Sequence, residues 1–232
     1  MKVPYAYGSS MDRVSKGFRD ALIERREDVF RVCRDLPAGW GKYDVEIGCG
    51  HGHFLAAYAE AHPERYCIGI DIAGGRLERA RRKSERAGLK NIAWIRAEAL
   101  LFLECLPETI SFSRVFILFP DPWPKKRHHK HRLVQTGFMD FLSSVCRPGA
   151  TLYFRTDNSD YAKHAGDAIA GSGAWEERPT EVWPWERASV FQELAEEYQS
   201  LVARKCAPQG RAEVCVRPGS QIPQSRRRQG PF

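Results

Sequence analysis

A glycine-rich turn is the first feature of this sequence that could support chemistry. Residues 44–52 read DVEIGCGHG, so a short apolar strand pattern runs directly into alternating glycines that include Gly48 and Gly50. Glycines at such a turn let the backbone approach a bound ligand where a Cβ atom would clash. The turn indicates a nucleotide-like ligand, although dinucleotide enzymes and chance turns share the same pattern.

Acidic residues accompany three successive predicted strands and narrow the choice of ligand. Asp71 ends the second strand about 20 residues after the glycine turn, where a carboxylate binds ribose hydroxyls, and Glu98 follows the third strand, where it could accept from an adenine amino group. Glu46 would repel a pyrophosphate but attract the cationic methionine end of S-adenosylmethionine. Each acid alone is compatible with a solvated surface charge. Together with Gly48 and Gly50, the three acids predict a site for S-adenosylmethionine rather than NAD.

A proline-flanked acid follows the fourth predicted strand. Residues 119–123 read FPDPW, so Asp121 lies between two prolines that fix the local backbone and remove two amide donors. In open α/β sheets, ligands and chemistry collect at the carboxyl ends of the strands. Trp123 offers a flat surface for a nucleobase, and stacking of this kind contributes roughly 1–3 kcal/mol per base. The alternative is a rigid turn with a core tryptophan.

A run of basic residues comes next. Residues 125–132 read KKRHHKHR and consist entirely of Lys, Arg and His. Such a run is usually a solvated loop, but beside Asp121 it favours a strip that binds phosphates. The three histidines do not predict a metal site, because the fixed cations among them would repel a metal ion. A second group of cations between residues 75 and 86 either extends an RNA-facing surface or belongs to an ordinary exposed helix.

Hydrophobic patterning predicts the elements that hold these residues. Short apolar runs alternate with longer helical patterns, which is typical of an α/β fold with a mostly parallel sheet flanked by helices. We expect strands at 43–47, 66–71, 92–95, 114–119 and 150–155. Helices are expected at 15–33, 75–86, 134–145, 160–170 and 190–198, with another beginning after residue 52 and a helical turn at 100–103. We expect one domain over residues 1–207, including an N-terminal helical segment over about 1–40, and a flexible basic tail over 208–232.

Composition sets the broad class. The sequence has 232 residues, 43% of them hydrophobic, and a net charge of +7, which favours a globular protein with a polyanionic partner. No apolar run approaches the roughly 20 residues that cross a bilayer, and the first residues lack the apolar core of a signal peptide. We therefore expect a cytoplasmic protein without a membrane partner. The seven scattered cysteines form no C-x-x-C pair, which argues against a zinc site or a disulfide framework.

The segment FPDPWPKKRHHKHRLV, residues 119–134, closely resembles the bacterial tRNA (guanine-N7-)-methyltransferase family, TrmB. The resemblance extends over about 43–161 through EIGCG at 46–50, GID at 69–71 and RTDN at 155–158. It implies the Rossmann-like class I S-adenosylmethionine-dependent methyltransferase fold, with the cofactor bound by Glu46, Asp71 and Glu98. The resemblance also implies that Asp121 is the catalytic acid and contacts the cofactor. Lys125 and Asp157 would contact the tRNA, with His128 close by.

This sequence departs from the family pattern in three places. Where the family has Thr-x-Phe/Tyr-Glu near its C-terminus, the best match is residues 189–192, SVFQ, so Ser189 keeps a hydroxyl and Gln192 replaces the glutamate. We predict that both contact the substrate. His131 stands where many members have arginine. The family's N-terminal segment and final strand are hard to find here.

These features predict methyl transfer from S-adenosylmethionine to N7 of a guanosine in the tRNA variable loop. N7 carries an in-plane lone pair and no proton, so alignment of the reacting atoms rather than a strong base would drive the reaction. Asp121 would position the guanine through its N1–H or amino edge and offset the positive charge arriving on the ring. Two alternatives are a methyltransferase that acts on another nucleobase or a small molecule and a non-catalytic RNA-binding protein with this fold. The sequence does not decide between a monomer and a homodimer.

Overall fold

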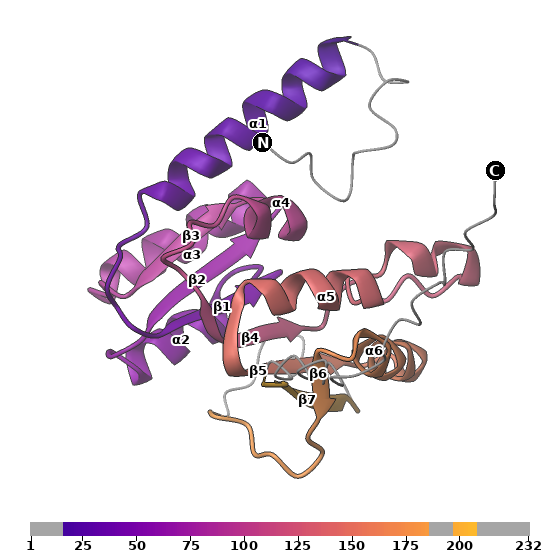
Figure 1. Ribbon diagram of the computed structural model, residues 1–232. Helices are drawn as coiled ribbons and strands as arrows, with labels where there is room; N and C mark the ends of the chain where they lie inside the picture. The colour runs from indigo at the N-terminus through magenta and orange to yellow at the C-terminus, as the bar shows by residue number, and fades with distance from the viewer. Residues whose placement is uncertain (1–15, 186–196, 208–232) are drawn as a thin grey trace, which may run out of the picture.

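The computed structural model describes residues 16–185 and 197–207, and the strands within these ranges form one sheet (Figure 1). Their order across the sheet is β3-β2-β1-β4-β5-β7-β6. The first five strands run parallel, and β7 pairs antiparallel with both β5 and β6. The strands are β1 (Tyr43–Ile47), β2 (Tyr66–Asp71), β3 (Ile92–Arg96), β4 (Phe112–Leu118), β5 (Cys146–Thr156), β6 (Trp175–Glu177) and β7 (Gln199–Lys205).

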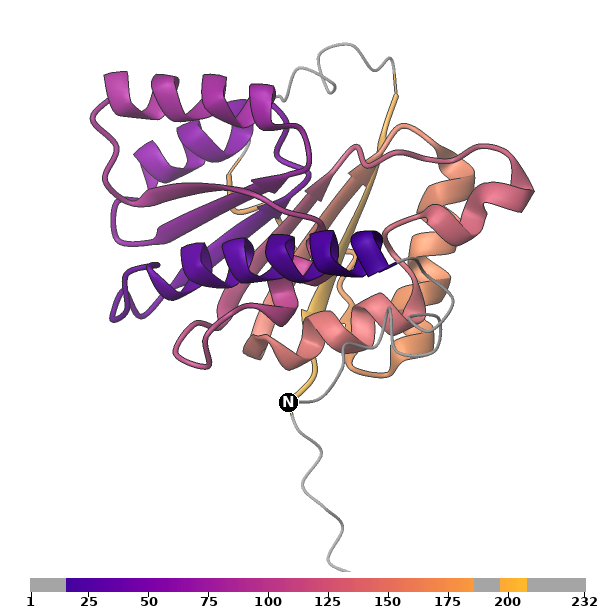
Figure 2. The same ribbon diagram turned by 90° about the horizontal axis from the view of Figure 1, so that it is seen from above.

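Helices cover both faces of this sheet, and Figure 2 shows α1 lying across the strands on one face. Side chains of α1, α4, α5 and α6 share the larger hydrophobic cluster with one face of the strands. Side chains of α2 and α3, with those of Trp183 and Trp185, form the second cluster on the other face. The helices are α1 (Lys16–Arg34), α2 (His53–Ala61), α3 (Gly74–Arg86), α4 (Ala99–Glu104), α5 (Thr136–Ser144) and α6 (Ser159–Ser172), and the 3₁₀ helix is η2 (Lys126–His131).

The central strands β1 and β2 are buried on both faces, although β1 carries two acids, Asp44 and Glu46, among its apolar residues. Every residue of β1 and β2 is buried. Within β1, Val45 and Ile47 belong to the larger cluster. Because side chains alternate between the faces of a strand, Glu46 points to the opposite face, where α2 packs. A carboxylate therefore lies in the buried centre of the sheet.

A buried ionic network holds the amino-terminal half of β1 and its neighbours. The Asp44 carboxylate accepts from Arg65 Nη2 at 2.6 Å and from the Tyr58 hydroxyl at 2.8 Å. Arg114 Nη1 in turn donates to the Tyr58 hydroxyl oxygen at 2.6 Å. Pairing of this quality offsets the cost of removing the charges from water. The network stabilises the sheet away from the glycine turn.

The α/β architecture expected from the sequence is confirmed, and the five expected strands lie within a few residues of their predicted bounds. The largest difference is at β5, which begins at Cys146 rather than 150. It includes the Arg147-Pro148-Gly149 segment opposite a register shift in β4. The antiparallel strands β6 and β7 were not predicted, because β6 has only three residues and β7, QSLVARK, is polar at both ends.

Some expectations fall outside the described residues. These are residues 1–15 of the predicted N-terminal segment, the tail over 208–232, and the candidate substrate residues Ser189 and Gln192. The predicted helix at 190–198 lies outside them up to residue 196, and its last two residues, 197 and 198, are not helical, so that part of the prediction was wrong. Within the described ranges, no helix is both long enough and apolar enough to span a bilayer.

Candidate active site

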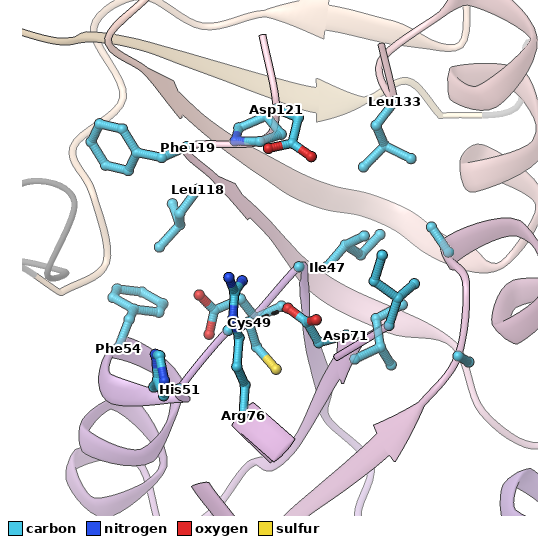
Figure 3. A pocket seen from close by; sticks show the side chains of 18 of the residues that line it. Ile47, Cys49, His51, Phe54, Asp71, Arg76, Leu118, Phe119, Asp121 and Leu133 are labelled. Atoms are coloured by element: carbon cyan, nitrogen blue, oxygen red, sulfur yellow. Dashed lines mark hydrogen bonds between the residues drawn. The ribbon is translucent and has the colours of Figure 1, made fainter. Parts of the chain in front are cut away.

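A cavity of about 420 Å³ lies at the carboxyl ends of β1, β2 and β4 (Figure 3). The glycine turn after β1, the residues after β2 and the loop after β4 form its walls. From β1 the chain adds β2 and then β3 on one side of the sheet, and it then returns to add β4 on the other side of β1. This reversal is the topological switch point at which open α/β sheets bind their ligands. The fold therefore places the cavity where a ligand site is expected.

The glycine turn has a backbone that only glycine adopts readily. Gly48, Gly50 and Gly52 have φ angles of +80°, +54° and +68°. A Cβ atom added at Gly52 would collide with the Trp94 ring and would lie 2.8 Å from the Cβ atom of Ala80. The turn is thus packed closely against α3 and β3 on one side. Its other side lines the cavity, where no side chain separates Gly48 and Gly50 from a ligand.

Glu46 presents an unpaired carboxylate oxygen at the cavity. The residue is 4% exposed, and Oε2 has no hydrogen-bond partner among the described residues. Burial raises the pKa of this carboxyl to about 8, the nearby charge of Asp71 adds to the rise, and a hydrogen bond from the Leu55 backbone opposes it. A buried acceptor without a partner is costly. A ligand that brings a hydrogen-bond donor, above all a cationic one, would remove this cost.

Asp71 orders the glycine turn from the end of β2. Its Oδ2 accepts from the Gly50 backbone N–H at 2.9 Å, and its Oδ1 accepts from the Ala73 backbone N–H at 2.7 Å. Each carboxylate oxygen has a second lone pair. Asp71 also lines the cavity, so it can accept hydrogen bonds from ligand hydroxyl groups while it holds the turn.

Glu98 does not line the cavity, although the residues on either side of it, Ala97 and Ala99, do. Its Oε1 lies 3.3 Å from Arg25 Nη1 of α1, and the two side chains are 48% and 42% exposed. The third predicted cofactor acid therefore lies beside the cavity and forms an exposed ion pair. The other two acids, Glu46 and Asp71, face the cavity directly.

The loop after β4 brings Asp121 to the opposite wall. Asp121 is exposed and lines the cavity, and Figure 3 shows its carboxylate directed into this space. Phe119 and Trp123, two residues to either side, have positive φ angles of 49° and 45°. Non-glycine residues in this conformation cost about 1–3 kcal/mol each and persist only where the surroundings hold them. Such strain is typical of functional loops.

Trp123 lies at the mouth of the cavity as part of an aromatic cluster. It is 38% exposed, so it is not the core tryptophan of the alternative interpretation. Its ring centroid lies 5.1 Å from that of His131 and 5.8 Å from that of His128, which is nearly perpendicular to it. Trp123 and His131 both line the cavity. The cluster forms an aromatic surface beside Asp121.

The basic run forms η2 and divides into exposed and buried cations. Lys125, Lys126, Arg127 and Lys130 are exposed, as a phosphate-binding strip requires. Arg132 is 3% exposed, so its assignment to this strip was wrong, because its guanidinium group points into the protein. Asp157 is exposed in the turn that follows β5. The structure thus places the candidate substrate residues Lys125, His128 and Asp157 on the loops after β4 and β5.

The cations of α3 differ in how they are paired. Arg81 and Arg82 both pair with Glu78, at 3.1 and 2.9 Å. Arg76 instead lines the cavity, as does His51 of the glycine turn. Sequence reasoning missed both as cavity residues. Arg76 could have been found from its position in the first turn of the helix that follows Asp71. Within the described part of the chain, no cluster of His, Cys, Asp or Glu has the arrangement of a metal site.

The sheet order and the cavity at its switch point define a class I S-adenosylmethionine-dependent methyltransferase fold. Among solved structures, this fold is shared with the 16S rRNA (adenine(1408)-N(1))-methyltransferase of Catenulisporales acidiphilia. The TM-score is 0.51 at 18% identity, and the match covers 80% of this chain and 92% of that one.

Sequence comparisons identify the particular family. The model of the family described as "Putative methyltransferase" matches residues 42–208. A tRNA (guanine-N(7)-)-methyltransferase of Leifsonia xyli is 38% identical over 157 residues, which are 62% of this chain and 69% of that protein. That of Syntrophotalea carbinolica is 39% identical over 140 residues, which are 59% of this chain and 60% of that protein. This chain belongs to the tRNA (guanine-N7-)-methyltransferase family, although it spans less than two thirds of several relatives it matches.

Proposed function

We propose that this protein transfers the methyl group of S-adenosylmethionine to N7 of a guanosine in the variable loop of tRNA. The observation that carries the proposal is that two carboxylates in different environments line one cavity. Glu46 is buried with an unpaired oxygen, and Asp121 is exposed beside Trp123. The first suits a cationic cofactor and the second an incoming base. The named activity of the relatives supports this substrate.

The residues around the cavity fit S-adenosylmethionine. The Glu46 Oε2 atom would accept from the α-ammonium group, and the free lone pairs of Asp71 would accept from the ribose hydroxyls. Glu98, beside the cavity, would accept from the adenine amino group. Gly48 and Gly50 would allow close approach of the backbone. When bound, the cofactor supplies an electrophilic methyl group on a sulfonium centre.

Asp121 would act on the guanine rather than on a proton at the reacting atom. Its carboxylate accepts hydrogen bonds from the N1–H or amino group of the base, which fixes the direction in which N7 points. It also stabilises the positive charge that develops on the ring. No base catalyst is needed because N7 carries a free lone pair, so correct alignment supplies most of the acceleration.

The surface around the cavity would hold the RNA. Trp123 stacks on the target base after that base leaves its own stack, a step that costs a few kcal/mol. The exposed cations of residues 125–130, Lys125 among them, would contact phosphates, with His128 close by. Asp157 would contact the substrate from the turn after β5. Ser189 and Gln192 complete the proposed substrate residues.

The experiment is methyl transfer from labelled S-adenosylmethionine to unmodified tRNA, followed by digestion and identification of the methylated nucleoside. The proposal predicts N7-methylguanosine. Asp121→Ala should lower the rate on the order of a hundredfold or more. The matched control is Asp140→Ala, an exposed acid of α5. A different methylated nucleoside would identify another nucleobase as the substrate. Absence of product despite binding of both ligands would favour the RNA-binding alternative.

A further inference from the structure

The basic run contains one cation that the proposed RNA surface does not use. Arg132 is 3% exposed, and its guanidinium group donates in two directions. Nε donates to the Pro122 carbonyl oxygen at 2.8 Å. Nη2 donates to Asp160 Oδ2 at 2.6 Å, and Nη1 donates to the Asp160 carbonyl oxygen at 3.4 Å. The guanidinium carbon also lies 4.9 Å from the centroid of the Tyr161 ring.

These contacts join the two loops that carry the substrate-facing acids. Pro122 follows Asp121 directly in the loop after β4, and Asp160 lies three residues after Asp157 at the start of α6. His129 Nε2 of the same basic run also lies 3.5 Å from Asp160 Oδ2. The Tyr161 hydroxyl accepts from the Val134 backbone N–H at 3.2 Å and links the same segments farther from the cavity. Arg132 is therefore the side chain that connects the backbone beside Asp121 to the turn of Asp157.

The loop of Asp121 has a strained backbone, so contacts from outside the loop are needed to fix its conformation. Phe119 and Trp123 are both strained, and prolines at 120 and 122 remove two backbone donors. On its β4 side, the Phe119 backbone N–H donates to the Arg155 carbonyl oxygen at 2.8 Å. On its other side, the Pro122 carbonyl oxygen is held by Arg132. Asp121 lies between these two anchor points.

We propose that Arg132 is a positioning residue for methyl transfer, which fixes Asp121 relative to the turn of Asp157 without touching the substrate. The proposal rests on the proposed function, since it assumes that Asp121 acts on the base. Only a planar guanidinium group has donors spaced to reach Pro122 and Asp160 together. The requirement at position 132 is thus for the shape of arginine as well as its charge.

Arg132→Lys tests this requirement because it keeps the charge and removes the fork of donors. We expect the single-turnover rate of methyl transfer to fall on the order of a hundredfold, the size of effect that a small misplacement produces. The dissociation constants for S-adenosylmethionine and tRNA should stay within about threefold. Asp160→Asn replaces the carboxylate by an amide oxygen that can still accept from Arg132. It should therefore lower the rate of methyl transfer, but by less than Arg132→Lys does.

Arg65→Lys is the matched control for a purely structural effect. Arg65 is also buried, and its guanidinium group pairs with Asp44 away from the cavity. Both lysine variants should melt at lower temperature than the wild type. At an assay temperature well below both melting temperatures, only Arg132→Lys should lose rate. Equal rates in the two variants, or equal losses, would overturn the positioning role.

Hydrogen exchange gives a readout that needs no activity. In Arg132→Lys, the backbone amides of the loop segment 119–126 should exchange faster than in the wild type, and in Arg65→Lys they should not change. If wild-type protein transfers no methyl group to tRNA, the proposed function fails while this measurement still decides whether Arg132 holds the loop. If hydrogen exchange of the loop and the rate of methyl transfer are both unchanged in Arg132→Lys and in Asp160→Asn, the positioning role of Arg132 is overturned while the proposed function still stands.

Discussion

Glu46 and Asp121 line one cavity from the adjacent strands β1 and β4, but Glu46 is buried and Asp121 is exposed. This difference in exposure separates what the two carboxylates can do. Burial raises the pKa of Glu46 to about 8 and leaves one of its oxygens without a partner. Asp121 remains open to a large substrate at the mouth of the cavity. The predictions that follow test this division of roles.

Cofactor binding should release a proton from Glu46. The carboxyl group, with a pKa of about 8, is mainly protonated at pH 6.5 before binding, and a cationic group at Oε2 favours the ionised form. Titration calorimetry at pH 6.5 in two buffers of different ionisation enthalpy should show release of up to one proton. The affinity should rise with pH from about 6 to 8. Glu46→Gln should abolish the release, whereas no release in the wild type would contradict the role of Glu46.

The unliganded protein should lose stability as this same group ionises. Because the pKa of Glu46 is raised from 4.5 to about 8 on folding, its contribution to the free energy of unfolding is fully present below about pH 4.5. It is lost as the pH rises to about 8. At about 1.4 kcal/mol per pKa unit, the loss amounts to a few kcal/mol. Urea unfolding should show this slope in the wild type, and Glu46→Gln should be flatter over the same range. Identical slopes would contradict the raised pKa.

Removal of the Trp123 ring should weaken RNA binding without affecting the cofactor. Stacking contributes about 1–3 kcal/mol per base, so Trp123→Ala should raise the tRNA dissociation constant roughly five- to a hundredfold. The cofactor dissociation constant should change little. Phe30→Ala is the matched control, since Phe30 is an exposed aromatic residue of α1 and is 54% exposed. Equal tRNA affinities for the two variants would contradict a stacking role.

Charge removal in the basic run should change the salt dependence of tRNA binding. If Lys125 neutralises one phosphate, Lys125→Ala should reduce the slope of log affinity against log salt by about 0.7–0.9. Arg82→Ala is the control, because Arg82 on α3 already pairs with Glu78. Filter binding at several salt concentrations measures both slopes. A larger change of this slope in Arg82→Ala than in Lys125→Ala would indicate that α3, rather than the basic run, contacts the RNA phosphates.

Much of the fold could be predicted because its determinants are local. The strand patterns of β1, β2 and β4 and the glycines that follow β1 lie within short windows of sequence. Parallel topology then brings the ends of these strands together, and Glu46, Asp71 and Asp121 all line one cavity. The cavity follows from strand order rather than from any single motif.

The missed features depend on contacts between distant segments. β7 is recognised as a strand by its pairing with β5 and β6, since its own sequence is partly polar. The burial of Arg132 depends on Asp160, 28 residues later. Nothing within residues 125–132 separates this cation from its exposed neighbours. Glu98 similarly pairs with Arg25 of α1, a contact that no local pattern predicts.

The most direct test of the central claim uses tRNA transcripts in which guanosine is replaced by 7-deazaguanosine, so that a C–H group stands at the position of N7. Labelled S-adenosylmethionine is supplied to these transcripts and to matched transcripts with ordinary guanosine, and tRNA binding is measured for both. We expect methyl transfer to the ordinary transcript and none to the 7-deaza transcript, with similar affinities for the protein. Equal methyl transfer to both transcripts would contradict N7 as the acceptor.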